Sequence, residues 1–441
     1  MLFTGIAMES THVLSQLSWS ALAQSLADEP GFCLFDVPGA THEPAPIRVM
    51  TALPRFRETC YQCADHTAGL SQRARQAPED SAGWLPLKLG FVSYGDGEME
   101  LPTRRPSPSP LIQVNEYDWL ILYRPETGAM ELRIHRDCPP GRRQYIHGRL
   151  NALMGAHHAA HKPGFHLTSG FAALQSRADY MECIQRIHDY IHAGDVYQVN
   201  YAQPFRARYE GHPIHAFQAL HWANPGPCST YFDTGVNRIL SLSPERFLKV
   251  RRGQVETRPI KGTRGRGSTP EEDRKLAEAL LTSPKDRAEN LMIVDLLRND
   301  LGRCCRIGSV RAEPLFALET FTNVHHLVSC ITGELAPGLS PLDLLLSAFP
   351  GGSITGAPKR RAMEVIRELE EEPRGVYCGS FFHWTPCNGF DSTIAIRTLE
   401  CRDGEITCFG GGGIVADSEP EAEYQESITK IQLLMDVLTK L

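Results

Sequence analysis

The sequence predicts a globular protein of the α+β class. Strand-like runs and helical stretches are interspersed along the chain without the regular strand–helix–strand alternation of a parallel sheet, and their spacing is too irregular for a TIM barrel. The chain contains no repeat at the periods of solenoid proteins. Of its 441 residues, 42% are hydrophobic and 22% are charged. These fractions are typical of globular domains, so disordered and fibrous classes are excluded.

The charge, hydropathy and cysteine content of the chain indicate which partners it can bind and in which cellular compartment it works. The chain has 45 Lys and Arg against 52 Asp and Glu, a net charge of −7, which disfavours a nucleic-acid binder. It has no run of about 18 apolar residues that could span a membrane, and its N-terminus lacks the basic region of a secretory signal. The 13 cysteines are odd in number and scattered from Cys33 to Cys408, as in reduced cytoplasmic proteins. We therefore expect a cytoplasmic protein that binds neither nucleic acid nor membrane.

One cysteine pair superficially resembles half of a metal site. Cys60 and Cys63 are followed by His66, but a structural zinc site needs four ligands, usually in two spaced pairs. The adjacent Cys304 and Cys305 have the wrong spacing to complete it. We interpret all of these cysteines as ordinary thiols.

The first segment, residues 1–165, has mixed character. Strands are predicted at Leu87–Val92 and Trp119–Leu122, separated by loops such as Pro102–Pro110 that are rich in Pro, Ser and Arg. A helix at Tyr145–Leu153 and a linker then lead out of the segment.

The second segment, residues 166–441, carries clearer patterns. Ser176 is a plausible N-cap for a helix at Arg177–His192, which ends at Gly194. The boundary near 165 divides the sequence and need not separate two folding units. Further strands are predicted at Val196–Phe205, Ile239–Leu242, Phe247–Val250, Ile394–Leu399 and Ile406–Phe409, and helices at Glu271–Leu281, Ala288–Leu297, Pro341–Ala348, Lys359–Glu371 and Pro420–Leu438.

Two of the predicted helices carry acidic residues on one face. Ser283 and Pro284 form a helix start, and Asp286 and Glu289 follow with i, i+3 spacing. Acids beside an apolar stripe usually mark a solvated face.

The second helix begins near Ser418, where Ser418 and Glu421 form a possible capping box. Glu423, Glu426 and Lys430 then share one face. If the two helices converged, their four acids would repel one another unless a hard cation such as Mg²⁺ lay between them. Spacing in the sequence does not decide whether they meet.

Two glycine-rich segments could approach a ligand closely. The segment 349–359 leads into a helix, where backbone amides and the helix N-terminus favour an anion, although a plain turn explains it equally well. The four glycines Gly410–Gly413 follow a strand, and Arg397 is predicted to lie within another.

Two single residues have the chemistry of catalysts but also have simpler explanations. Lys261 lies in a short apolar step before a Gly/Arg loop, and amine attack would require a lowered pKa, which Arg258 and Arg264 could provide by repulsion. Glu245 follows a strand and could be a general acid. A solvated lysine and a surface glutamate are the alternatives.

Taken together, these segments resemble the chorismate-utilising enzymes. The resemblance rests on the order and spacing of several motifs and spans about residues 177–438, with a weaker match through LKLGFVSYG at 87–95 and YDWLILY at 117–123. The motifs are SPE at 243–245, PIKGTR at 259–264, KDRAENLMIVDLLRNDLGR at 285–303, VHHLVS at 324–329, FPGGSITGAPK at 349–359 and GGGGIVADSEPEAEYQE at 410–426.

Lys261 decides which branch of the family is implied. Members that form anthranilate usually have Ala there (PIAGT), whereas members with PIKGT aminate chorismate at C4 through a covalent lysine adduct. Members that make salicylate or isochorismate carry a water-activating lysine where this chain has Gln198. The resemblance therefore implies an enzyme of the transaminase class that makes 4-amino-4-deoxychorismate for p-aminobenzoate and folate synthesis. An anthranilate-forming enzyme is the alternative, and a catalytically silent subunit is disfavoured because the key residues are present.

The resemblance also implies a role for each site residue. Lys261 is expected to be the nucleophile and Glu245 the acid. Glu289 and Glu426 are expected to ligate Mg²⁺ directly, with Asp286 and Glu423 acting directly or through water. The implied substrate-binding residues are His326 near the C4 hydroxyl, Tyr377 and Arg397 at the enolpyruvyl carboxylate, and Gly262, Thr263, Ser353, Gly411 and Lys430 around the ring carboxylate and metal.

The implied fold is a sandwich of two large antiparallel sheets with helices around them, to which both segments contribute. Nothing in the chain resembles a glutaminase. A separate glutamine amidotransferase subunit is therefore the implied source of ammonia.

Overall fold

The computed structural model describes residues 12–13, 18–37, 47–61, 70–78, 83–95, 109–155, 163–321 and 324–441. Cys63, His66 and most of the predicted loop Pro102–Pro110 lie outside these residues. The twelve cysteines in the described ranges are all free thiols.

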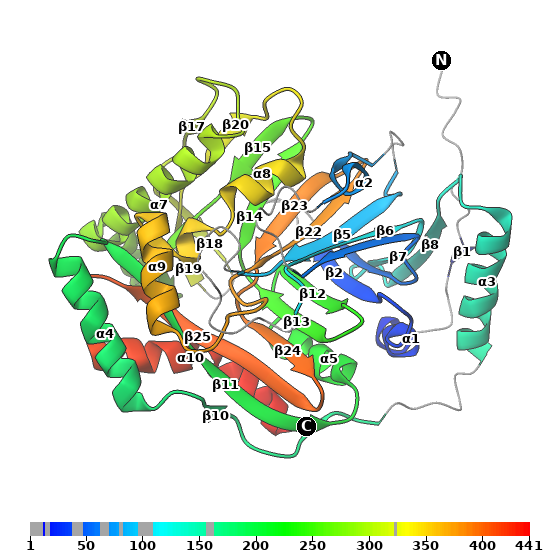
Figure 1. The fold of residues 1–441 in the computed structure, drawn as a ribbon, viewed down its shortest axis with the longest axis horizontal. Coiled ribbons are helices and arrows are strands. Elements are labelled where there is room, and N and C mark those ends of the chain that lie inside the picture. Colours follow the sequence, from blue (N-terminus) through cyan, green and yellow to red (C-terminus); the bar gives the residue numbers. More distant parts are fainter. Residues whose placement is uncertain are drawn as a thin grey trace.

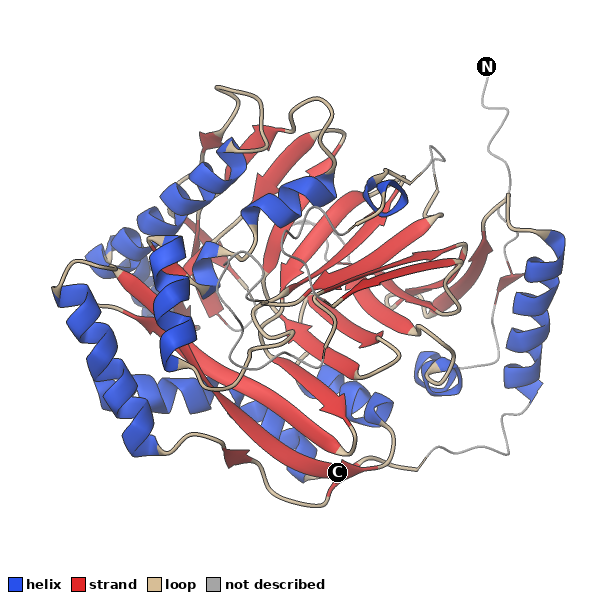
Figure 2. Cartoon of the chain, in the orientation of Figure 1, coloured by secondary structure: helices blue, strands red, loops and turns tan. Residues whose placement is uncertain are grey.

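The described chain folds as two large antiparallel sheets and one small one, with helices at the periphery (Figures 1 and 2), so the predicted α+β class and sandwich are confirmed. The largest sheet has thirteen strands in the order β1-β8-β7-β3-β2-β12-β13-β24-β25-β11-β10, with β9 and β21 also paired to β11. These strands are β1 (His12–Val13), β2 (Cys33–Val37), β3 (Ile47–Thr51), β7 (Trp119–Arg124), β8 (Ala129–Ile134), β9 (His166–Leu167), β10 (Ala172–Ala173), β11 (Gln198–Glu210), β12 (Cys228–Asp233), β13 (Arg238–Ser243), β21 (Gly356–Ala357), β24 (Thr398–Arg402) and β25 (Glu405–Ile414).

The second large sheet has nine strands and the small sheet has three, in the described part of the chain. The nine-stranded sheet runs β17-β20-β15-β14-β23-β22-β5-β6-β4, and the small sheet runs β16-β19-β18. Their strands are β4 (Phe56–Cys60), β5 (Leu87–Val92), β6 (Ile112–Tyr117), β14 (Arg246–Arg251), β15 (Gln254–Thr257), β16 (Ile260–Gly265), β17 (Arg311–Ala312), β18 (Ala317–Thr320), β19 (Val324–Val328), β20 (Ile331–Glu334), β22 (Ser380–Thr385) and β23 (Gly389–Ile394).

Both large sheets contain strands from either side of residue 165. β2 pairs with β12 in one sheet, and β5 pairs with β22 in the other. The two sheets pack face to face through aromatic residues: Phe91 of β5 and Phe232 of β12 meet edge to face, with ring centroids 5.2 Å apart. Removing each such side chain from water contributes about 1.5–3 kcal/mol, so strands from both segments stabilise the same core.

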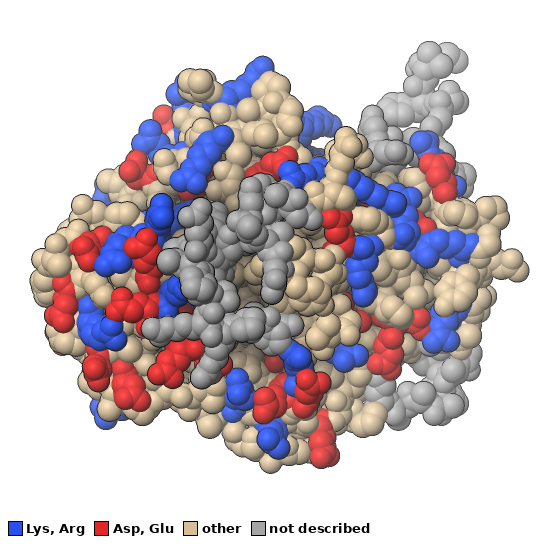
Figure 3. Space-filling view, in the orientation of Figure 1, with Lys and Arg blue, Asp and Glu red and all other residues tan. Residues whose placement is uncertain are grey.

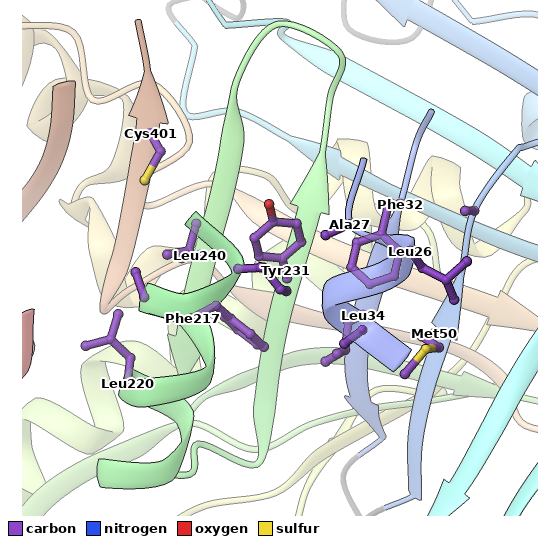
Figure 4. Packing of buried hydrophobic residues seen from close by; sticks show 14 of the residues in the cluster. Leu26, Ala27, Phe32, Leu34, Met50, Phe217, Leu220, Tyr231, Leu240 and Cys401 are labelled. Carbon is purple, nitrogen blue, oxygen red and sulfur yellow. The ribbon is translucent and has the colours of Figure 1, made fainter. Parts of the chain in front are cut away.

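Helices cover the outer faces of the sheets. Buried residues of α1 (Trp19–Leu26), α5 (Pro213–Ala223) and α10 (Pro420–Thr439) share one cluster with strands of the thirteen-stranded sheet, part of which is shown in Figure 4. The remaining helices are α2 (Gln72–Arg75), α3 (Pro140–Gly155), α4 (Arg177–His192), α6 (Pro270–Thr282), α7 (Pro284–Gly302), α8 (Pro341–Ala348) and α9 (Lys359–Leu369), with a 3₁₀ turn at Gly352–Ile354. No helix in the described ranges is long and apolar enough to cross a bilayer. On the face in Figure 3, positive and negative side chains are interspersed.

Helix starts were predicted with mixed success. Ser176 caps α4 and Ser283 caps α7, each through its side-chain oxygen, as predicted. The capping box at Ser418 is wrong, because Glu419 is the N-cap of α10 and makes no side-chain capping bond. The Ser418 hydroxyl instead donates to Glu423, 2.7 Å away.

The predicted strand Ile394–Leu399 is also wrong. β23 ends at Ile394 in the nine-stranded sheet and β24 begins at Thr398 in the thirteen-stranded sheet, so the chain crosses between sheets here. Arg397 therefore lies in the crossover and not within a strand. Its φ of +51° belongs to the left-handed region, which L-residues rarely adopt.

Of the two glycine-rich segments, 349–359 leads into a helix as predicted, whereas Gly410–Gly413 are placed differently from the prediction. Gly410–Gly413 lie inside β25 and pair with β11, instead of following a strand. At Gly410 a Cβ would lie 2.0 Å from the carbonyl oxygen of Ser427 in α10, so close helix packing requires glycine there. Segment 349–359 forms the 3₁₀ turn and β21 before α9 begins at Lys359.

Candidate active site

Lys261 projects from the small sheet at an irregularity in its register. β16 pairs with β19, Lys261 opposite Leu327 and Thr263 opposite His326, and the register shifts between these pairs. The residue in between, Gly262, has a φ of +76°, which glycine adopts without steric cost. Such bulges re-aim side chains next to functional sites.

The half-buried Lys261 ammonium lies among carboxylates from three different elements. Burial lowers the pKa of Lys261, and the nearby Glu289, Glu245 and Glu426 partly counteract this effect. These acids come from α7, from the turn between β13 and β14, and from α10. The tertiary structure thus places one amine of lowered pKa among acids that are far apart in sequence.

The cation that lowers the pKa of Lys261 is not one of the predicted arginines. Arg258 is paired with Glu319, and Arg264 lies 2.9 Å from Asp286. The expectation that these two arginines repel Lys261 is therefore wrong, because each is neutralised by its own carboxylate. Lys430 of α10 exerts the repulsion instead.

Glu245 is held in a turn by hydrogen bonds to its backbone and its carboxylate. Its N–H donates to the Ser243 hydroxyl (3.2 Å), its carbonyl accepts from the N–H of Ile394 (3.1 Å), and the Ser353 hydroxyl donates to Oε1 (3.1 Å). Burial raises the pKa of Glu245, while Lys261 and Ser353 oppose that rise. A raised pKa is what a carboxyl group needs to act as a general acid.

His326 and Thr263 face each other across the paired strands β19 and β16. The Thr263 hydroxyl and His326 Nδ1 are 2.9 Å apart, and Phe321 meets the imidazole edge to face at 5.5 Å. Burial lowers the pKa of His326, which a hydrogen bond with the Gly262 backbone partly offsets.

Arg397 and Tyr377 occupy different surroundings. Burial lowers the pKa of Arg397, and no carboxylate in the described ranges forms an ion pair with it. Tyr377 is buried and stacks on Phe409, with ring centroids 5.1 Å apart and planes inclined by 10°. It lines a cavity of about 310 Å³ that none of the other predicted site residues lines.

The four predicted metal ligands lie on α7 and α10 but do not form a closed shell. Asp286 is paired with Arg264, and Glu426 with Lys430 at 2.6 Å. Burial raises the pKa of Glu423, and the charge of Glu426 raises it further. In the described part of the chain, no three acidic, histidine or cysteine side chains are grouped closely enough to hold a metal ion.

The chemistry of these side chains nevertheless fits a hard cation. A Cβ on Gly412 would lie 3.1 Å from Glu423 Oε2 and 3.5 Å from both Glu426 Oε1 and Lys430 Nζ. Glu423 and Glu426 repel each other beside the backbone of Gly412. Glu289 lies near the same group, since it and Glu426 both act on the charge of Lys261. Together these carboxylates provide the oxygen donors that Mg²⁺ prefers.

Lys430 connects the acidic residues of α10 to Gly411 of β25. Lys430 Nζ donates to the Gly411 carbonyl at 3.0 Å. Gly411 has no room for a side chain, since a Cβ would lie 2.3 Å from the Tyr201 carbonyl oxygen. The glycine is thus required by strand packing, and its carbonyl orients Lys430.

Several residues that hold the site together were not predicted to belong to it. Ser418 orients Glu423. Asn290 of α7 donates to the Leu327 carbonyl of β19 (3.3 Å) and accepts from the hydroxyl of Ser329, just beyond that strand (2.5 Å). Asn290 and Ser329 are fully buried. The sequence marks Asn290 only as a polar residue among the apolar positions of the predicted helix.

Comparison with known proteins identifies the family. The model of the chorismate binding enzymes matches residues 32–436. Aminodeoxychorismate synthase component 1 of Klebsiella aerogenes is 46% identical over 365 residues, 82% of this chain and 79% of that protein. Anthranilate synthase component 1 of Aquifex aeolicus is 44% identical over 263 residues, 60% of this chain and 53% of that protein.

A solved structure supports the same assignment. The crystal structure of anthranilate synthase component I from Streptococcus pneumoniae superposes with a TM-score of 0.74 at 27% identity, covering 89% of this chain and 93% of that one. The chain belongs to the family of chorismate binding enzymes.

Proposed function

We propose that this chain catalyses the aminodeoxychorismate synthase reaction, in which chorismate and ammonia give 4-amino-4-deoxychorismate and water, a transaminase-class transfer. The observation that carries the proposal is the lowered pKa of Lys261 beside the raised pKa of Glu245. Both shifts favour the uncharged forms, an amine that can act as nucleophile and a carboxyl group that can act as acid. The 46% identity to an aminodeoxychorismate synthase component 1 supports this choice of reaction.

The first step joins Lys261 to the ring. Lys261 Nζ adds at C2 of chorismate, both conjugated ring double bonds shift (C1=C2 to C1=C6 and C5=C6 to C4=C5), and the C4–oxygen bond breaks. Glu245 donates its proton to the departing hydroxyl group, which leaves as water. The Ser353 hydroxyl, 3.1 Å from Glu245 Oε1, stabilises the carboxylate that this transfer leaves behind.

The second step reverses the shift. Ammonia adds at C4, both ring double bonds return to C5=C6 and C1=C2, and the C2–nitrogen bond breaks to release the Lys261 amine. The surplus proton of the added ammonia returns to Glu245, so the enzyme recovers its starting state.

The remaining residues bind the substrate in this proposal. His326, supported by Thr263, contacts the C4 side of the ring. Arg397, whose guanidinium is half-buried without a carboxylate partner in the described ranges, suits the enolpyruvyl carboxylate. Tyr377, which stacks on Phe409, is assigned to the same carboxylate by the family resemblance alone. The residues assigned to the ring carboxylate are Gly262, Thr263, Ser353, Gly411 and Lys430.

Glu289 and Glu426 would hold Mg²⁺, with Glu423 and Asp286 in direct or water-mediated contact once Arg264 releases Asp286. When bound, the cation supplies positive charge that neutralises the ring carboxylate and makes the ring a better electrophile. Until then Lys430, 2.6 Å from Glu426, balances part of the negative charge.

Ammonia is supplied by a separate subunit in this proposal. The relative's designation as component 1 supports a partner, for which a glutamine amidotransferase has the required chemistry. We place the reaction in p-aminobenzoate and folate synthesis in the cytoplasm, where the free thiols of the described residues would stay reduced.

The test is product analysis of the wild-type chain and of Lys261→Ala with chorismate, Mg²⁺ and ammonium, with and without an aminodeoxychorismate lyase. We expect 4-amino-4-deoxychorismate from the wild type. Lys261→Ala should lose C4 amination and shift any residual turnover toward anthranilate. Anthranilate as the main wild-type product, or unchanged C4 amination by the variant, would refute the proposal.

A further inference from the structure

The two consecutive histidines of β19 serve opposite faces of the small sheet. His326 faces Thr263 on one side, whereas His325 is 2% exposed and faces α6 on the other. Both ring nitrogens of His325 are used: Nδ1 lies 2.9 Å from the Thr320 hydroxyl and Nε2 lies 2.9 Å from Asp273 Oδ1. Because neighbouring strand residues alternate faces, whatever holds His325 also sets the orientation of His326.

Asp273, in the first turn of α6, gathers contacts from the small sheet. Arg266, just beyond β16, donates to both carboxylate oxygens at 2.8 Å, and the Gly267 N–H donates at 2.9 Å. The same arginine donates from Nη1 to the Phe321 carbonyl at 2.8 Å. Arg266 and His325 thus fasten all three strands of the sheet to one helix through Asp273.

The far end of α6 supports the bulge beside Lys261. Leu280 is fully buried, and a Cβ on Gly262 would lie 2.7 Å from its Cδ1. Asp273 and Leu280 are seven residues apart, about 10 Å along a rigid helix. Fixing the first turn of α6 through Asp273 therefore fixes Leu280 beneath Gly262, the residue that re-aims Lys261.

We propose that Arg266, Asp273 and His325 are positioning residues for the chemistry at Lys261. They hold α6 and the small sheet in the arrangement that presents the Lys261 amine and the His326 ring to the substrate. The inference rests on the proposed nucleophilic role of Lys261, and it assigns a role to His325 and Arg266, which the reaction steps do not use.

A second ion pair on the same helix provides a matched control. Glu271 and Arg274 are 3.6 Å apart, with side chains 70% and 77% exposed. Such an exposed pair contributes little to stability, and neither residue contacts the small sheet through a hydrogen bond or ion pair in the described part of the chain. Glu271→Gln removes a charge from α6 as Asp273→Asn does, but leaves the sheet contacts intact.

The first experiment measures steady-state amination with saturating ammonium and the thermal midpoint of each variant. We expect Asp273→Asn to lower kcat at least tenfold while KM for chorismate changes less than threefold, and Glu271→Gln to match the wild type. An unchanged kcat in folded Asp273→Asn would overturn the inference.

A pair of His325 variants tests the same point if Asp273→Asn does not fold. His325→Gln keeps an amide donor near the position of Nε2 and should retain most of kcat, whereas His325→Leu has no donor and should lose at least tenfold. Equal kcat values for these two variants would overturn the inference.

The second readout does not require turnover. The pH dependence of Lys261 acylation, followed by peptide mass spectrometry without chorismate, should move to higher pH in His325→Leu because water reaches a displaced amine more easily. An unchanged profile would contradict the positioning role. This measurement is independent of product identity, so failure of the proposed reaction in the Lys261→Ala test is distinguishable from failure of this inference.

Discussion

The hydrogen bond from Ser353 to Glu245 offers a way to test whether Glu245 is the acid, because removing this bond should shift the pKa of Glu245 by a predictable amount. Ser353→Ala removes the donor 3.1 Å from Oε1. Because that bond stabilises the carboxylate and thereby lowers the pKa of Glu245, its loss must raise the pKa further. A hydrogen bond to a charged group contributes about 1.5 kcal/mol at the lower end of its range, a factor of about 10 in an acid dissociation constant.

The sign of the effect on activity follows from the role of Glu245 as proton donor. Activity falls on the alkaline side when Glu245 loses its proton, so Ser353→Ala should move the alkaline limb of the kcat/KM profile upward by about one pH unit. The maximum rate itself should fall, since the carboxylate formed on proton transfer is less stabilised.

The assay is kcat/KM for chorismate between about pH 6 and 10 at fixed free ammonia and Mg²⁺, with ammonium adjusted for its own ionisation. Ser353→Thr keeps the hydroxyl group and should leave the limb in place. A Ser353→Ala limb that stays fixed or moves to lower pH would refute the assignment of Glu245 as the acid that Ser353 tunes.

Two other predictions concern the metal and the fold. Glu426→Gln should weaken the Mg²⁺ dependence of chorismate turnover, measured as the Mg²⁺ concentration giving half-maximal rate, and an unaltered titration would remove Glu426 from the metal site. Lys359→Met should destabilise the protein by about 3–5 kcal/mol in urea unfolding, because it removes the cation 2.6 Å from the fully buried Asp300 and leaves an uncompensated charge. Burial already raises the pKa of Asp300 above its ordinary 3.8, so the folded state holds that proton more tightly than the unfolded state and the loss in Lys359→Met should grow as pH rises above 3.8. A destabilisation of the same size at pH 3.5 and 7 would contradict that explanation.

The amphipathic patterns of the C-terminal half identified most of its helices. Residues Arg177–His192 and Pro341–Ala348 were predicted at their observed bounds, because their caps and apolar spacing are local properties of the chain. The N-terminal strand Leu87–Val92 was also predicted at its observed bounds. Local patterns failed where tertiary contacts decide the backbone, as at Arg397, where the chain changes sheets.

The motifs identified the chemistry but not how it is arranged. Lys261, Glu245 and the acids of α7 and α10 were recognised from their order along the chain. Their convergence depends on packing between strands and helices separated by up to about 180 residues, which no local pattern encodes. For the same reason no pattern in the chain indicates that Arg264 pairs with Asp286, or that Tyr377 stacks on Phe409 beside a separate cavity.

Composition, periodicity and motif order were enough to predict the class of fold, the family resemblance and the identity of the reactive groups. Which charges face one another, and which are withdrawn from water, depends on how distant segments pack in the folded chain. Those two factors set the proton affinities of Lys261 and Glu245, because a pKa responds to burial and to neighbouring charge and not to position along the chain.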